Sequence, residues 1–109
     1  MANRPEYELL ASSFGFEWDA GNRSKSWLKH GVAKNECEEV FFNLPHMILP
    51  DAKHSTQETR QYLMGKTHQG RLLLLVFTIR TDKIRVISAR DANRKEKEVF
   101  KTHEKDTEI

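Results

Sequence analysis

The feature that most constrains the fold is a long apolar run in the second half of the chain, Arg71-Leu-Leu-Leu-Leu-Val-Phe-Thr-Ile79. The run is apolar at odd and even positions alike, except at Thr78. Nine residues of this kind, without a helical period, are typical of a strand that is covered on both faces. We therefore predict a central β-strand over residues 71–79, around which the other elements are arranged.

Further strands are predicted from alternating apolar positions and from turn residues. They cover residues 14–18, 46–49, 59–66 and 84–89. Gly70 supplies a positive φ for the turn before the central strand, and residues 81–83 turn the chain back after it. Consecutive strands with short turns between them predict an antiparallel sheet.

Helices are predicted on either side of this sheet, from capping residues and from apolar positions at helical spacing. They run from Asp19 to about His30, from about Cys37 to Leu44 with Asn35 as a possible cap, and from Asp91 onwards. Cys37 lies on the apolar stripe of the second helix, so we interpret it as a packing residue. The predicted order is β-α-α-β-β-β-β-α, an α+β fold with a small antiparallel sheet and flanking helices.

The length of 109 residues allows one domain. We expect a weakly ordered N-terminal tail over 1–13, a single domain over 14–103 and a frayed C-terminal tail over 104–109. The sequence has no apolar stretch that could span a membrane and no signal peptide, so we expect a cytoplasmic protein. With one cysteine, no metal-ligand spacing among its five histidines and no Gly-rich phosphate loop, the chain is expected to use neither metal nor cofactor.

Positive charge is concentrated in one part of the chain. Between Arg60 and Lys95 there are nine basic residues and two acidic ones, although the net charge of the whole chain is only +2. Such asymmetry favours a polyanion or an acidic protein as partner over a uniformly solvated surface.

Three arginines in this region stand at or near strand ends, namely Arg60, Arg80 and Arg90. If the turn at 81–83 has three residues, Arg80 and Arg90 point to the same side of the sheet. Together with Arg60 they could form a concave cationic cluster that binds phosphate. The alternative is three unrelated arginines on the rim of the sheet.

A ribonuclease that works without a metal also needs a base and an acid beside the scissile phosphate. The available groups are Lys29, His30, Glu58 and Tyr62, although Lys29 and His30 could simply compensate the dipole of a helix end. Tyr62 could also stack on a base, and with Arg85 and Arg94 it completes the candidate RNA-binding residues.

At this point six segments of the sequence resemble the BrnT family of bacterial toxins, in order and with compatible spacing. They are Phe16-Glu-Trp-Asp19, Lys29-His-Gly-Val32, Glu39-Val-Phe-Phe42, Glu58-Thr-Arg60, Val76-Phe-Thr-Ile-Arg80 and Arg85-Val-Ile-Ser-Ala-Arg90. The resemblance implies a RelE-like fold, RNA cleavage that halts growth, and neutralisation by an antitoxin of the BrnA type. It also implies that the complex of toxin and antitoxin binds operator DNA through the antitoxin.

Position in these segments makes Lys29, His30, Arg60, Arg80 and Arg90 the catalytic candidates, with Glu58 as a weaker one. The chain departs from the family at three places, one of which is Asn43-Leu44-Pro45 in place of a more acidic turn. Ala33 stands where a serine usually caps the second helix, and Phe100 stands where a tyrosine is common. If that hydroxyl serves in proton transfer, this chain could instead be a non-catalytic module that binds antitoxin or RNA; a small-ligand or regulatory domain is a third reading.

Overall fold

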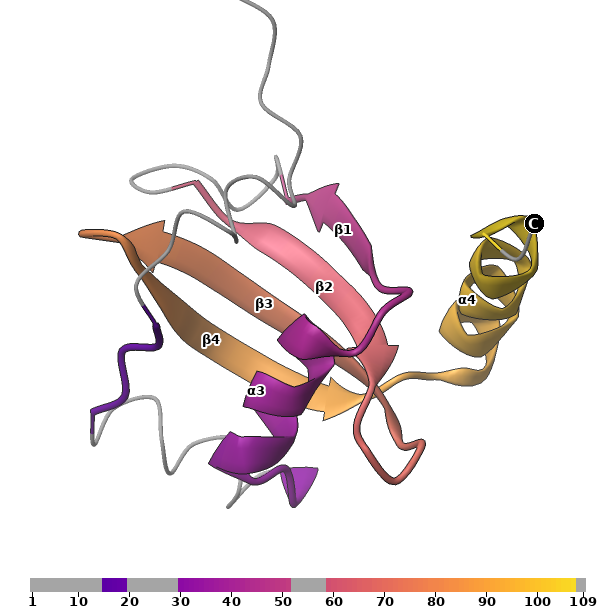
Figure 1. Ribbon diagram of the computed structural model, residues 1–109, viewed down its shortest axis with the longest axis horizontal. Helices are drawn as coiled ribbons and strands as arrows, with labels where there is room; N and C mark the ends of the chain where they lie inside the picture. The colour runs from indigo at the N-terminus through magenta and orange to yellow at the C-terminus, as the bar shows by residue number, and fades with distance from the viewer. Residues whose placement is uncertain (1–14, 20–29, 52–58, 108–109) are drawn as a thin grey trace, which may run out of the picture.

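The structure, a computed structural model, describes residues 15–19, 30–51 and 59–107. Its elements are α3 (Lys34–Phe42), β1 (Met47–Pro50), β2 (Gln61–Lys66), β3 (Leu72–Arg80), β4 (Lys83–Asp91) and α4 (Arg94–Thr107). The four strands form one antiparallel sheet in the order β1-β2-β3-β4, with α3 across one face and α4 at one end (Figure 1). The predicted α+β class is confirmed. The predicted tail over 1–13, and residues 20–29 of the predicted first helix, lie outside the described residues.

The face under α3 holds the larger core. Alternate residues of β2 and β3 point to this face and are fully buried, for example Leu63, Leu73 and Leu75. They pack against the stripe of α3 that includes Cys37 and Val40, as expected from its helical spacing. Burial raises the pKa of the Cys37 thiol to about 12, which fits a packing residue rather than a nucleophile.

The opposite face is covered only in part. Phe100 of α4 is buried there against Met64 and Ala92, with Leu72 and Leu74 at the edge of this smaller cluster. The prediction of a central strand at β3 is therefore confirmed, but full cover on both faces is not. Residues 73, 75 and 77 are buried, whereas residues 72, 74 and 76 are half-buried.

Both helix starts differ from the predicted ones. The N-cap of α3 is Ala33 rather than Asn35, and its backbone N–H donates to the Glu36 carboxylate at 3.0 Å. The cap of α4 is Asn93 rather than Asp91, because the Asn93 side chain accepts the Glu96 N–H and the Glu96 carboxylate accepts the Asn93 N–H, both at 2.8 Å. Asp91 belongs to the end of β4, where it binds an arginine instead.

Arg80 and Arg90 do share a face of the sheet, but not for the predicted reason. The turn between β3 and β4 has two residues, because Arg80 pairs with Lys83. A two-residue turn alone would place Arg90 on the opposite face. A β-bulge at Ile87 corrects this, since the pairing skips that residue and Arg90 then lies opposite Leu74.

The predicted strand over 14–18 is wrong in its described part. Phe16 makes one isolated parallel bridge with Ile84, and backbone bonds of 2.8 Å join Ile84 to Gly15 and Glu17. Phe16 packs edge-on against Phe41. This segment therefore lies along β4 as a short parallel contact.

At the other end of the chain, α4 continues through residues 104–107, which the sequence had suggested were a fraying tail. Neither described helix has the length and apolar character needed to cross a membrane.

Candidate active site

A basic cleft of about 450 Å³ opens between α4 and the end of the sheet where β4 finishes. Its charged lining consists of four cations and two carboxylates. They are Lys66, Arg71, Lys97, Lys101, Asp91 and Glu104. Lys66 pairs with Glu104 at 2.8 Å, and Arg71 pairs with Asp91, so the excess positive charge is that of Lys97 and Lys101, which are exposed on α4.

Arg71 holds this end of the molecule together. Its guanidinium donates to both carboxylate oxygens of Asp91, at 2.7 and 3.0 Å, and to Glu36 at the start of α3. It also donates to the backbone carbonyls of His30 and Gly31, at 3.3 and 2.9 Å. One side chain thus joins the end of β4, the first turn of α3 and the chain at 30–31, which only the planar five-donor guanidinium can do.

This network includes the backbone of His30. His30 is exposed, and its carbonyl is bound by Arg71. The pKa of Asp91 is lowered, first by the hydrogen bond from Arg71 and in smaller part by the charge of His30. Arg71 therefore connects an exposed imidazole-bearing residue, through its backbone, to the cationic cleft that Arg71 itself lines.

Arg90 stands one residue before Asp91 and faces the other side of α4. Its two terminal nitrogens donate to the Glu96 carboxylate at 2.8 and 2.9 Å, and one of them also donates to the Asp91 carbonyl. These bonds raise the pKa of Arg90 and lower that of Glu96, so the pair is ionised at neutral pH. Tyr62 and Arg90 line the same groove, which is separate from the basic cleft, so the structure brings these two predicted residues together.

Of the remaining predicted residues, Arg94 lies at this end of the sheet because α4 begins just after β4, whereas Arg60, Arg80 and Arg85 do not. Arg90 pairs with Leu74 on β3, and Arg80 lies six residues further along that strand. At 3.3 Å per residue, the distance between the two arginines along the sheet is about 20 Å. Arg80 and Arg85 instead contact Glu17, and Arg85 also contacts Asp19 at 2.7 Å. Arg60 precedes β2 towards the same far end, and Arg94 is exposed at the start of α4. Lys29 and Glu58 lie outside the described residues.

Sequence reasoning missed Arg71, Lys97 and Lys101 as site residues. In the sequence, Arg71 is only one of nine basic residues, because nothing local shows that it binds three segments distant in sequence. Lys97 and Lys101 stand four residues apart, a spacing that places both on one side of a helix and could have been noticed. Among the described residues, there is no group of three or more histidine, cysteine, aspartate or glutamate side chains that could hold a metal ion.

Comparisons with known proteins agree with this fold. A profile of the family described as "Ribonuclease toxin, BrnT, of type II toxin-antitoxin system" matches residues 18–96. The crystal structure of the Brucella abortus ribonuclease toxin, BrnT, superimposes with a TM-score of 0.57 and 20% sequence identity, over 75% of this chain and all of that one. No curated protein sequence is similar enough to this chain to count as a match. The chain belongs to the BrnT family of ribonuclease toxins of type II toxin–antitoxin systems.

Proposed function

We propose that this chain is an endoribonuclease that needs no metal ion, and that RNA phosphate binds in the basic cleft beside α4. The observation that carries the proposal is that Arg71, which lines the cleft together with Lys97 and Lys101, also binds the backbone carbonyl of His30. Acting in the cytoplasm, such an activity would inhibit growth by destroying RNA.

In the proposed reaction, the nucleophile comes from the RNA itself. A base takes the proton of a ribose 2′-hydroxyl, the 2′-oxygen attacks the adjacent phosphorus, and the 5′-oxygen leaves with a proton from an acid. The products are a 2′,3′-cyclic phosphate and a 5′-hydroxyl. We assign this proton transfer to His30, because an imidazole has a nitrogen that can accept a proton and one that can donate it.

The cations of the cleft would stabilise the extra negative charge on the phosphorane. Lys97 and Lys101 are exposed on α4 and can reach a phosphate in the cleft. Arg71 is held by Asp91 and Glu36, so its main part is to keep the chain at 30–31 in place. Donors that are fixed before the reaction lose little energy in reorganising, which is why this arrangement favours the transition state.

The direct test is cleavage of RNA by the purified protein in EDTA. His30→Gln should lower the rate constant by about 10²- to 10⁴-fold, the usual contribution of a general acid or base. The double change Lys97→Ala and Lys101→Ala should also lower it, whereas Lys83→Ala removes the same kind of charge at the far end of the sheet and should not. Activity that disappears in EDTA and returns with a divalent cation would contradict the proposal, as would full activity in His30→Gln.

Neutralisation by a BrnA-like antitoxin is proposed from the family alone, together with operator binding by the complex. If the antitoxin covers the basic cleft, adding it should abolish RNA cleavage and slow hydrogen exchange in α4. The complex, but not the toxin alone, should retard operator DNA in a gel. Inhibition without any change in α4 would place the antitoxin elsewhere.

A second candidate function is a non-catalytic module that binds antitoxin or RNA. Two observations favour it. Both terminal nitrogens of Arg90 are bound to Glu96, and Phe100 is a buried core residue with no hydroxyl. Expression in bacteria separates the two functions, because growth arrest that is lost in His30→Gln supports the enzyme. Absence of both arrest and cleavage, with RNA binding retained, supports the module.

A further inference from the structure

A second cavity lies on the other side of α4 from the basic cleft. This groove has a volume of about 380 Å³, within the range of roughly 300–1,000 Å³ found for small-molecule sites. Its lining is an apolar floor with polar groups along one rim. The lining residues are Leu49, Tyr62, Met64, Leu74, Arg90, Asn93, Lys95, Glu96 and Val99.

The floor of the groove is the part of the sheet that α4 leaves uncovered. Tyr62 stands between Leu49 on β1 and Val76 on β3, on the face opposite α3. The side of the groove is formed by Val99, which is 48% exposed although it is apolar, and Leu49 is 50% exposed. A half-buried aromatic ring beside an open apolar floor is a surface on which a flat ring can stack.

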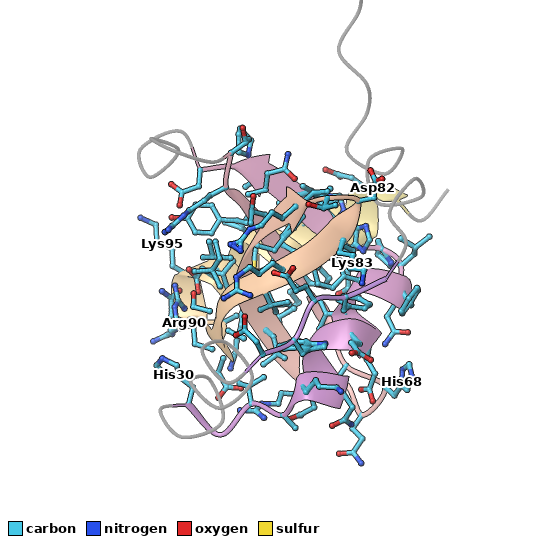
Figure 2. All side chains as sticks on the ribbon, turned by 90° about the vertical axis from the view of Figure 1, so that its left-hand side faces the viewer. His30, His68, Asp82, Lys83, Arg90 and Lys95 are labelled. Carbon is cyan, nitrogen blue, oxygen red and sulfur yellow. The ribbon has the colours of Figure 1, made fainter. Side chains whose placement is uncertain are left out.

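The rim carries positive charge that continues towards the proposed catalytic site. Arg90 and Lys95 both line the groove, and Arg71 binds both Asp91, the neighbour of Arg90, and the backbone carbonyl of His30. Figure 2 shows Lys95, Arg90 and His30 one after another along one side of the molecule, away from Lys83 and Asp82. A series of cations next to an aromatic groove matches the chemistry of single-stranded RNA, whose phosphates and bases alternate in the same way.

We propose that the groove binds one unpaired nucleobase of the RNA substrate, stacked on Tyr62, while the flanking phosphates follow Lys95 and Arg90 towards His30. This inference rests on the proposed ribonuclease function and assigns a base-recognition subsite to it. The groove and the basic cleft lie on two sides of α4, so a strand that passes the end of this helix can occupy both.

The polar groups in the groove give it a means to distinguish bases. Glu96 offers carboxylate oxygens to an amino or ring N–H group of a base, and it is fixed in place by Arg90 and by the Asn93 N–H. An acceptor held in this way favours bases that present donors on the Watson–Crick edge. Thus Tyr62 supplies affinity for any base, and Glu96 supplies preference among them.

The test measures binding without cleavage. Four homopolymeric pentanucleotides with 2′-O-methyl sugars, one for each base, are titrated against the protein, together with a pentamer of the same backbone that has no bases. The methyl group blocks the 2′-oxygen, so cleavage cannot interfere. We expect at least one base-bearing pentamer to bind about ten- to a hundredfold more tightly than the baseless one, as base stacking would provide.

Protein variants locate that difference. Tyr62→Ala should remove most of it, whereas Tyr62→Phe keeps the ring and should bind as the wild type does. Glu96→Gln should change the ranking of the four bases. The comparison of base-bearing and baseless pentamers uses the wild-type protein. Its outcome therefore does not depend on whether Tyr62→Ala folds.

Three results would overturn the inference. If all five pentamers bind the wild type equally and with the same salt dependence, RNA is held by its phosphates alone; the ribonuclease proposal then survives and the base subsite fails. If Tyr62→Ala leaves the pentamers unaffected but weakens binding of the antitoxin, the groove takes apolar side chains of a protein instead. If no pentamer binds at all, the proposed function fails together with the subsite.

Discussion

At the scale of single residues, Arg71 has the largest structural consequence. Its removal would leave Asp91 and Glu36 without the cation that now binds both, and two backbone carbonyls without their donor. Because hydrogen bonds to charged groups contribute more than neutral ones, Arg71→Met should lower the free energy of unfolding by about 2–3 kcal/mol in urea titration.

The control for this prediction is Arg71→Lys. An ammonium keeps the charge but cannot make the paired bonds to Asp91 and also reach Gly31, so the variant should recover only part of the loss. A lysine variant as stable as the wild type would show that charge alone matters at this position.

His46 is the residue whose titration should be visible in the stability of the protein. Burial lowers its pKa from the usual 6.5, with a further contribution from the charge of His103. The unfolded chain therefore takes up the proton first, so stability is complete above about pH 6.5 and decreases as pH falls below that value. In urea titrations between pH 7.5 and 5.5, the wild type should lose stability more steeply than His46→Asn; parallel curves would contradict this.

At the scale of elements, the turn between β3 and β4 carries backbone strain. Thr81 and Asp82 both have a positive φ, 51° and 65°, as a two-residue hairpin of this twist requires. A β-branched residue is poorly suited to that region. Replacing the pair by Asn-Gly should raise the free energy of unfolding by about 1 kcal/mol. Gly70 has a φ of 86°, so Gly70→Ala should lower the free energy of unfolding. Thermal or urea denaturation measures the change in both variants.

Helix α4 is attached to the sheet by few groups. Phe100 is its one described side chain that is fully buried in the small cluster, and a bond from His103 to the His46 carbonyl at 3.1 Å and the Lys66–Glu104 pair add polar contacts. Phe100→Ala should therefore speed hydrogen exchange in α4 by at least about tenfold and leave β3 protected. Val99→Ala changes an exposed neighbour and should have no such effect; equal acceleration in both elements would show that α4 unfolds only with the sheet.

At the scale of the whole molecule, we expect charge to decide how the proposed RNA substrate binds. For single strands, the logarithm of the binding constant decreases with the logarithm of salt concentration with a slope of about −0.7 per neutralised phosphate. Removing Lys97 and Lys101 should reduce the magnitude of this slope by about 1.4, whereas Lys83→Ala should leave it unchanged. The measurement is a titration of labelled RNA at several salt concentrations, and an equal effect of Lys83→Ala would mean that binding is spread over the whole basic surface.

The sequence alone determined the elements whose signals are local. The apolar run predicted β3, and the helical spacing of Cys37 and Val40 predicted α3. Gly70 predicted the turn that precedes β3, where its φ is positive. These succeed because backbone conformation and side-chain periodicity depend on near neighbours in the chain. The segments shared with the BrnT family likewise lie in the sequence itself, and the family match over residues 18–96 confirms that resemblance.

Only the tertiary structure decided which charges meet. The bulge at Ile87, and not the turn, put Arg80 and Arg90 on one face, yet the length of β3 holds them far apart. Arg71 became the centre of the site because it contacts segments from 30 to 91, a fact that no local pattern records. Strand register and long-range ion pairs depend on the positions of all the strands together. The sequence therefore shows which residues are basic, but it does not show which of them line the same cleft.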